Sequence, residues 1–158
     1  MRRFVDAYGA TAVEKAAERI VTDLKKAGPY FSGFFGESWV VRAGDVRIEA
    51  TQDNPLSASE KRQGASDGSL PLNRRITPTP IPKIDPAGDL AVTIGNRASY
   101  RNQAMDLVPG RVRDNANNTA PRDWYATYTE GGPLSKALQI AAKEAGQDKR
   151  IRGFKSDK

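Results

Sequence analysis

The chain has 158 residues, with 25 Lys and Arg against 19 Asp and Glu, and a net charge of +6 at pH 7. This length fits one domain with a single modest core, and the hydrophobic share of 38% is low for a globular chain. The sequence contains neither cysteine nor histidine. Composition therefore excludes disulfides, thiolate or imidazole metal sites, and Ser–His or Cys–His nucleophile pairs. We expect no enzyme, no cofactor and no metal.

No apolar run approaches membrane-spanning length, and polar residues or glycine interrupt the segment after the basic start Met1-Arg2-Arg3. We therefore expect no signal peptide, no membrane contact and synthesis in the cytoplasm. The sequence pI of about 9.7 permits contact with nucleic acid or with an acidic protein surface, and does not choose between them.

Residues 11–27 form the clearest predicted element. Apolar residues recur there at steps of three and four, which places one apolar stripe along a helix. Thr11 and Glu14 fit a capping box at its start, and two lysines occupy its last turn. Residues 2–8 fit an earlier helical turn, with Gly9 as a weak joint between the two.

Four short strands are predicted. Ser38–Ala43 and Val46–Ala50 are expected to pair through a two-residue turn at Gly44-Asp45. Leu90–Ile94 has a nearly continuous apolar run, which favours a central place in the sheet. Asp123–Thr129, rich in aromatic residues and threonine, predicts the fourth strand.

A second amphipathic helix is predicted over residues 134–145, with Pro133 suited to its first position. Residues 146–158 carry five positive and two negative charges and are expected to form a flexible basic tail. Trp39 and Trp124 are assigned to the core.

The middle of the chain, residues 51–86, holds six of the ten prolines and no pattern that predicts burial. The stretch 76–82 alternates proline with threonine and isoleucine, which favours polyproline II or an extended edge strand. The segment is either a disordered surface loop or an arm that orders against neighbouring subunits, and we favour the arm because proline lowers the entropy lost on docking. The predicted contact residues of this arm are Arg74, Arg75, Ile76, Pro78, Pro80, Ile81, Pro82 and Ile84.

These elements predict one α+β domain over residues 1–158. A long N-terminal amphipathic helix and a C-terminal helix pack on a small, curved, mostly antiparallel sheet, from which the Pro-rich arm extends. The carboxylate pairs Asp85/Asp89 and Asp45/Glu49 are better explained by turn chemistry and a solvated strand face than by acid–base catalysis.

This order of elements resembles the tail-completion or head–tail joining proteins of tailed bacteriophages, the minor-tail-protein-Z-like group. In that group a helix is followed by a Pro, a Thr or Ser with Gly, and a Ser, and later by Ile-Gly-Asn before a Tyr. The matching segments here are Gly28-Pro29, Ser32-Gly33, Glu37-Ser38-Trp39, Val92–Asn96 with Tyr100, and the Leu134–Ala145 helix.

The resemblance implies a structural virion protein without catalytic residues. It implies a cyclic homo-oligomer, expected to be a hexamer, that joins the head connector to the tail or terminates the tail tube. Its partners would be further copies of itself, the adjacent neck and tail-tube proteins, and DNA in the channel. The predicted interface with sister subunits is the arm, so removing residues 55–82 should leave a folded subunit that cannot assemble.

The alternative function is a basic nucleic-acid-binding module that acts through phosphate contacts. The Arg74-Arg75 pair and the basic tail support it, although no base-reading helix or stacking sheet is predicted. The predicted contacts with DNA or an acidic partner are Lys149, Arg150, Arg152 and Lys155.

Overall fold

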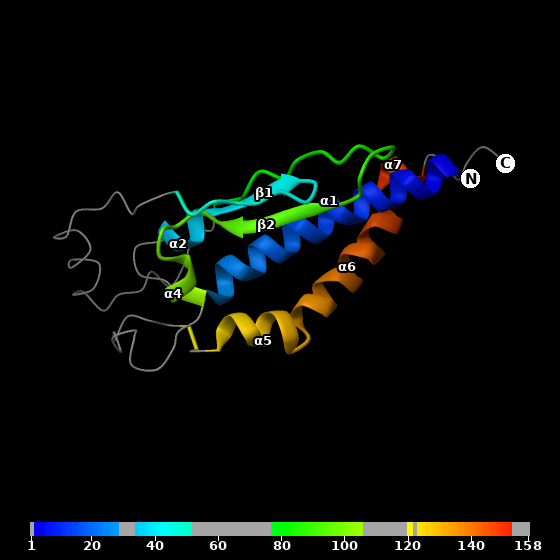
Figure 1. The fold of residues 1–158 in the computed structure, drawn as a ribbon. Helices are drawn as coiled ribbons and strands as arrows, with labels where there is room; N and C mark the ends of the chain where they lie inside the picture. Colours follow the sequence, from blue (N-terminus) through cyan, green and yellow to red (C-terminus); the bar gives the residue numbers. More distant parts are fainter. Residues whose placement is uncertain (1, 29–33, 52–76, 106–119, 122, 153–158) are drawn as a thin grey trace.

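The computed structural model describes residues 2–28, 34–51, 77–105, 120–121 and 123–152 (Figure 1). They form an α+β fold, as predicted, with a long N-terminal helix, C-terminal helices and a small antiparallel sheet. The elements are α1 (Arg2–Ala27), α2 (Phe34–Glu37), β1 (Trp39–Ala43), β2 (Val92–Asn96), α4 (Arg101–Met105), α5 (Trp124–Glu130), α6 (Pro133–Gln147) and α7 (Lys149–Arg152).

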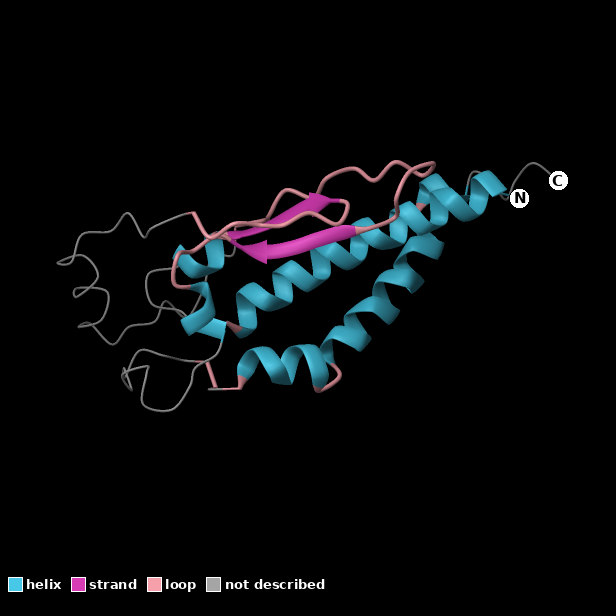
Figure 2. Ribbon diagram, viewed as in Figure 1, coloured by secondary structure: helices cyan, strands magenta, loops and turns pink. Residues whose placement is uncertain are grey.

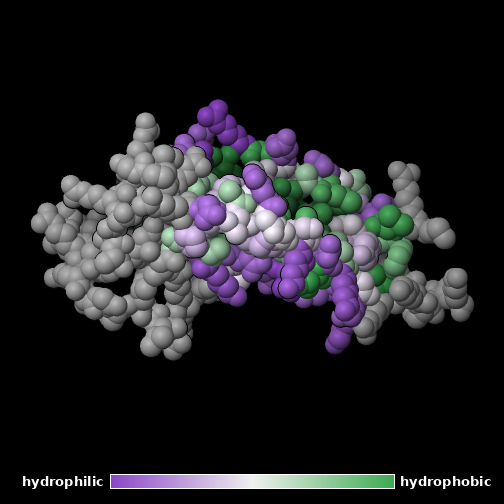
Figure 3. All heavy atoms as spheres, turned by 90° about the horizontal axis from the view of Figure 1, so that it is seen from below, coloured by the Kyte–Doolittle hydropathy of each residue, from purple (hydrophilic) through white to green (hydrophobic). Residues whose placement is uncertain are grey.

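Helix α1 is the central element, with the two strands on one side and α5 and α6 on the other (Figure 2). The strands pair antiparallel, with Trp39 opposite Asn96 and Ala43 opposite Val92. Seen from the side of α5 and α6, the described surface mixes hydrophilic and hydrophobic patches (Figure 3). Helix α1 is therefore covered by strands on one side and by helices on the other, and we call these its two covers.

The first helix begins at Arg2, so the predicted cap at Thr11 is wrong. Thr11 is buried inside the helix, and Glu14 accepts a hydrogen bond from the backbone N–H of Ile84 (3.0 Å) instead. The helix continues through Gly9, where a Cβ would come within 2.7 Å of a Leu90 methyl group. Close packing at this point outweighs the roughly 1 kcal/mol that glycine costs inside a helix.

The predicted strand Val46–Ala50 does not form a ladder. Gly44 has the positive φ (+80°) that the turn prediction required. The chain after it is held by the side chain of Thr93, and not by pairing with β1. The Thr93 hydroxyl accepts from the Val46 N–H (3.1 Å) and donates to the Gly44 carbonyl (2.8 Å). The partner of β1 is therefore β2, which lies two residues later than predicted and is not central in the two-stranded sheet of the described chain.

The predicted fourth strand is the helix α5. Trp124 and Tyr128, four residues apart, are both buried, whereas Ala126 and Thr127 between them are exposed. That spacing is the period of a helix, and the β-forming side chains of the segment concealed it. The Trp124 indole N–H donates to the Ala104 carbonyl (2.8 Å), which ties α5 to α4.

The closing helix begins at Pro133, as predicted, and the chain remains helical beyond it. Residues 149–152 form α7, and Ile151 is only 1% exposed, so the prediction of a flexible tail is wrong for this part. The burial of one large apolar side chain explains the difference, because it anchors a short basic helix beside α1. Residues 153–158 lie outside the described residues.

The core has two parts of different composition. Near α2, the rings of Phe35, Trp39 and Trp124 meet edge to face, with centroids 5.8 and 6.1 Å apart, which confirms both tryptophans as core residues. The buried residues of α6 are instead three alanines, and its main neighbour is α1. These alanines are Ala137, Ala141 and Ala145.

Candidate assembly surface

The three longer undescribed stretches, 29–33, 52–76 and 106–119, all leave and re-enter the described chain at the same end (Figure 1). We call this the loop end. The residues that flank these stretches are Gly28, Phe34, Thr51, Thr77, Met105 and Ala120. A site at this end would be built on the polar groups that hold these flanking residues in place.

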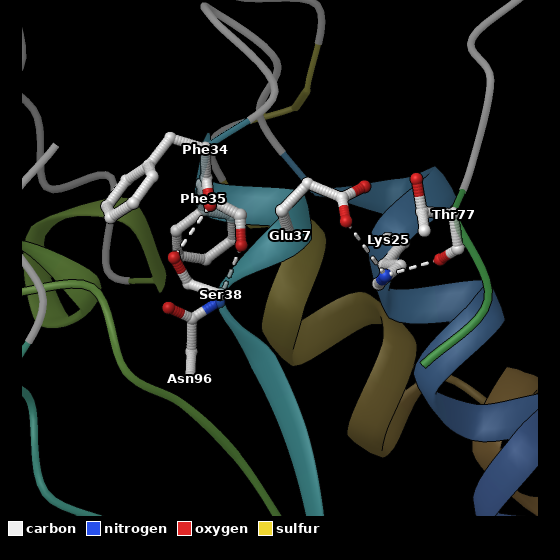
Figure 4. Close-up of polar contacts among 7 residues, drawn as sticks. All are labelled: Lys25, Phe34, Phe35, Glu37, Ser38, Thr77 and Asn96. Atoms are coloured by element: carbon white, nitrogen blue, oxygen red, sulfur yellow. Dashed lines mark hydrogen bonds and ion pairs between the residues drawn. The ribbon is translucent and has the colours of Figure 1, made fainter. Parts of the chain in front are cut away.

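A buried lysine holds the chain where it re-enters at Thr77. The Lys25 ammonium donates to the Thr77 carbonyl (2.7 Å) and lies 3.8 Å from a Glu37 carboxylate oxygen (Figure 4). Lys25 is only 7% exposed, and this burial lowers its pKa, with Glu37 acting in the opposite direction. The helix-terminal lysine therefore bonds to the backbone of a segment 52 residues away rather than to solvent.

Two arginines hold the chain where it leaves at Thr51. Arg101 donates to the carbonyls of Ile48 (2.6 Å) and Asn96 (2.9 Å). Arg97 donates to the Thr51 hydroxyl (3.0 Å). Hydrogen bonds from charged donors are about twice as strong as neutral ones. Both roots of the 52–76 segment are thus fixed to the fold by cationic side chains.

Buried amide and hydroxyl groups stiffen the base beneath these roots. Asn96 is fully buried; its amide N–H donates to the Phe35 carbonyl (2.8 Å), and its amide oxygen accepts from the Ala98 N–H (2.9 Å). The Ser38 hydroxyl donates to the Phe34 carbonyl (2.7 Å; Figure 4). The end of β2 is therefore locked to α2 by bonds that leave none of these buried groups unpaired.

After Thr77 the chain runs as a strap along α1, in the opposite direction to the helix. We use the word strap for residues 77–90. Thr77 contacts Lys25, Ile84 contacts Glu14 eleven residues earlier in α1, and the strap ends against Gly9. Residues 51–86 were predicted to have no packed place, and the last ten of them, residues 77–86, are in fact part of the fold.

The strap buries two isoleucines that lie three residues apart. Ile81 packs against the core and Ile84 is buried, whereas Thr77, Pro78, Pro80, Lys83 and residues 85–90 are exposed. A β-strand would place Ile81 and Ile84 on opposite faces, whereas the three residues per turn of polyproline II place them on the same face. The burial of this pair therefore favours the first of the two extended conformations that the prolines predicted.

The predicted arm contacts fall into three groups. Arg74, Arg75 and Ile76 lie outside the described residues. Ile84 is 6% exposed and belongs to the core of its own subunit, with Ile81 and Pro82 partly buried beside it. The exposed members within the described chain are Pro78 and Pro80. Deletion of residues 55–82 would therefore remove packed chain as well as the arm.

The predicted basic contacts lie away from the arm. Lys149 is exposed on α7, Arg150 and Arg152 belong to the same helix, and Lys155 is outside the described residues. Helix α7 lies beside the N-terminal part of α1, at the opposite end from the loop end (Figure 1). Among the residues that the structure describes, the two predicted groups lie at opposite ends.

Sequence reasoning missed the three cations that hold the loop roots, Lys25, Arg97 and Arg101. Lys25 was interpreted as a helix-dipole partner, and the two arginines carried no motif. The only available signal was the place of Lys25 in the last turn of a predicted helix.

Two features of the described residues bear on other classes of function. Within the described residues, no three or more acidic side chains are placed to hold a metal ion. No helix of the described chain is long and apolar enough to cross a bilayer. Comparisons with protein-family models, curated proteins and solved structures found no match to this chain.

Proposed function

We propose that this protein is a structural subunit of a tailed-phage virion, in the neck or at the end of the tail tube, where it forms a closed ring of identical copies. The observation that carries the proposal is the pair of clamped roots, at which Lys25 and Arg101 fix both ends of a 25-residue segment to one end of the fold. The resemblance in sequence supplies the virion setting.

Fixed roots favour an assembly role over a passive loop. A surface loop without function needs no buried cation at its base, because water satisfies its backbone groups. Desolvating Lys25 is unfavourable, as its lowered pKa shows. Holding the roots in register reduces the conformational entropy that the segment loses when it orders against a neighbour.

A ring demands two different contact faces on each subunit, since cyclic contacts beyond a dimer are heterologous. The loop end supplies one face, and the second must lie elsewhere on the described surface. The residues expected to contact the neighbour from the arm are Arg74 and Arg75, with the exposed Pro78 and Pro80.

The test is imaging of the purified protein at high concentration by negative stain, with mass measured by light scattering. Closed rings of about six copies are expected, the number that the resemblance implies. Replacing residues 55–74 with a Gly/Ser segment of equal length should abolish the rings and leave the unfolding temperature unchanged, because Thr51 and the strap are retained. The matched control replaces residues 108–117 in the same way. Wild-type protein that remains monomeric at all concentrations, with or without its virion partners, would contradict the proposal.

One observation favours the second candidate function, a nucleic-acid-binding module. The basic helix α7 packs beside the part of α1 that begins with Arg2-Arg3, so two basic stretches far apart in sequence share one end of the molecule. Binding to a DNA duplex that weakens steeply with salt, and that K149E with R152E reduces, would support this function. Binding without ring formation would favour it over the virion role.

A further inference from the structure

Helix α6 lies on the outside of the molecule, and its solvent side carries a row of long polar side chains (Figure 2). Lys136, Gln139, Lys143 and Gln147 are all exposed and follow one another at steps of three or four residues. They therefore share one side of the helix, opposite its buried alanines, with the two lysines about 10.5 Å apart along the axis. We call these four residues the lysine face. Lys149, exposed on α7, follows two residues beyond it.

The helix separates its charges by side. The two acidic residues near its C-terminal end pair with cations of α1: the Glu144 carboxylate lies 2.6 Å from the Arg19 guanidinium, and Asp148 lies 3.6 Å from the Lys15 ammonium. None of the exposed residues of α6, which the structure describes throughout, is acidic. In the described chain neither lysine of the lysine face forms an ion pair. The lysine face is therefore purely positive, whereas the charges between α6 and α1 cancel.

The stability of the helix does not explain this arrangement. Lys136 lies in the first turn, where its backbone N–H donates to the Gly132 carbonyl (2.9 Å) and where no residue is acidic. A positive side chain is unfavourable there, because the N-terminal end of the helix dipole is itself positive. Neither lysine has an acidic residue three or four positions away, so no ion pair within the helix offsets this cost. A surface that only keeps a protein soluble typically mixes both signs, so the lysine face points to an anionic partner.

We propose that the lysine face binds the phosphate backbone of duplex DNA, with each of its lysines contacting one phosphate group. Lysine is a flexible point charge, which suits phosphate, and glutamine amides donate hydrogen bonds to phosphate oxygens. Such contacts carry no sequence information, so we expect the protein to bind unrelated duplexes equally well. The proposal rests on the nucleic-acid-binding candidate function, for which it names the contact surface, and it needs no ring.

The composition of the lysine face favours DNA over an acidic protein. Lysine is depleted at protein–protein interfaces, whose affinity comes mainly from buried aromatic and arginine anchors. The lysine face has no such anchor, and Leu138, the exposed leucine of α6, lies on a different side of the helix. Interfaces with DNA are instead polar and strongly positive, which the four residues of the lysine face match.

The salt dependence of DNA binding tests the proposal. The variant K136Q/K143Q is compared with R42Q/K83Q, which removes two exposed cations from β1 and from the strap. Fluorescence anisotropy of a labelled duplex measures the binding constant over a series of salt concentrations. Each phosphate contact contributes about 0.9 to the steepness of log K against log salt, so K136Q/K143Q should reduce the slope by about 1.8. At about 50 mM salt this variant should bind about tenfold more weakly or worse, whereas R42Q/K83Q should keep the slope of the wild type.

Equal unfolding temperatures would show that both variants fold. Equal reductions of the slope in the two variants would overturn the proposal, because net charge alone would then explain the binding. A K136Q/K143Q variant that loses binding to polyglutamate and keeps the wild-type slope on DNA would also overturn it, since the partner would then be an acidic protein.

The same measurements separate the proposal from the function on which it rests. If K149E/R152E weakens DNA binding and K136Q/K143Q does not, the lysine face is wrong and the nucleic-acid-binding candidate stands. A wild-type protein that binds no duplex even at low salt would overturn both, and would leave the ring proposal standing.

Discussion

Near the loop end, α1 is covered by large rings that meet edge to face, and hydrogen bonds from Asn96 and Trp124 close the gaps between elements. Along α6, the same helix is covered by alanines, with the ion pairs Lys15–Asp148 and Arg19–Glu144 at the border. The rings bury much area per residue, whereas the alanines bury little and bring two helix backbones close together. We call the two regions the aromatic corner and the alanine interface.

This difference predicts that the two covers of α1 respond in opposite ways to a change in side-chain volume. A region built from large side chains is weakened by removing atoms, because cavities form. A region built from small side chains is weakened by adding atoms, because neighbouring backbones must move apart.

Trp124→Ala should have the largest effect. It removes a buried ring of the aromatic corner and leaves the Ala104 carbonyl without its donor, so we expect a loss of about 3–5 kcal/mol of unfolding free energy. Urea unfolding measures it. Trp124→Phe should be more harmful than Trp39→Phe, because the Trp39 indole N–H has no hydrogen-bond partner among the described residues. Equal losses in the two phenylalanine variants would show that the hydrogen bond to α4 contributes nothing.

Asn96→Ala tests the polar bonds of the same corner. It removes the partner of the buried Ala98 N–H and the shorter of two hydrogen bonds to the Phe35 carbonyl, which keeps the bond from the Ser38 N–H (3.3 Å). An orphaned buried group costs about 1–3 kcal/mol. We expect a total loss of roughly 2–4 kcal/mol in denaturant unfolding. Asn102→Ala, an exposed residue on α4, is the control and should change little. A loss of unfolding free energy no larger than that of the control would mean that water replaces both hydrogen bonds of Asn96.

Ala141→Leu tests the alanine interface. Ala141 is buried where α6 packs on α1, so the larger side chain should cost about 1–3 kcal/mol of unfolding free energy, measured in urea. Lys143→Leu on the exposed face of the same helix is the control for helix propensity. A stable Ala141→Leu variant would show that α6 is free to shift, and the contrast between the two regions would fail.

Lys25→Met tests the buried cation through pH. Because burial lowers the pKa of Lys25 below 10.5, the folded chain releases this proton at lower pH than the unfolded chain. The stability of the wild type should therefore rise as pH increases from the folded pKa toward 10.5, and the variant should lack this rise. Unfolding free energies are compared over that interval, with the exposed Lys26→Met as control. If the unfolding free energies of the wild type and of Lys25→Met changed in parallel with pH, the lowered pKa of Lys25 would be contradicted.

Arg19→Ala should have the smallest effect. Its ion pair with Glu144 is about one-third exposed and lies at the border of the alanine interface, so we expect less than about 1 kcal/mol of lost unfolding free energy. Raised salt should reduce the difference further. Arg47→Ala, which breaks the exposed pair with Glu49, provides the comparison for a pair outside any interface.

The two long helices could be predicted from sequence because each has a continuous apolar stripe of helical period. The first was nevertheless placed nine residues too late, since a capping-box pattern and Gly9 suggested a start that tertiary packing overrides. The segment of α5 was taken for a strand because Trp124, Tyr125 and Thr127 favour strands locally. The local preference of these side chains for strands disagrees with the four-residue spacing of Trp124 and Tyr128. The burial of both residues shows that the helical spacing prevails.

The candidate site was less predictable. The arm was identified from its prolines, but the packing of residues 77–90 as a strap depends on contacts between Lys25 and Thr77 and between Glu14 and Ile84. Such pairs join residues 52 and 70 positions apart, and no local pattern encodes them.

The order of elements also governs how this subunit is made. Helix α1 is synthesised first, while its strand partner β2 begins at Val92 and its helix partner α6 at Pro133. At about 5–20 residues per second, roughly 5–20 s separate the end of α1 from the start of α6 on the ribosome. The strands and the cations that hold Thr51 and Thr77 are complete once Arg101 has been added, whereas the helical cover of α1 is still absent. The two covers of α1 are therefore made one after the other, with the alanine interface last.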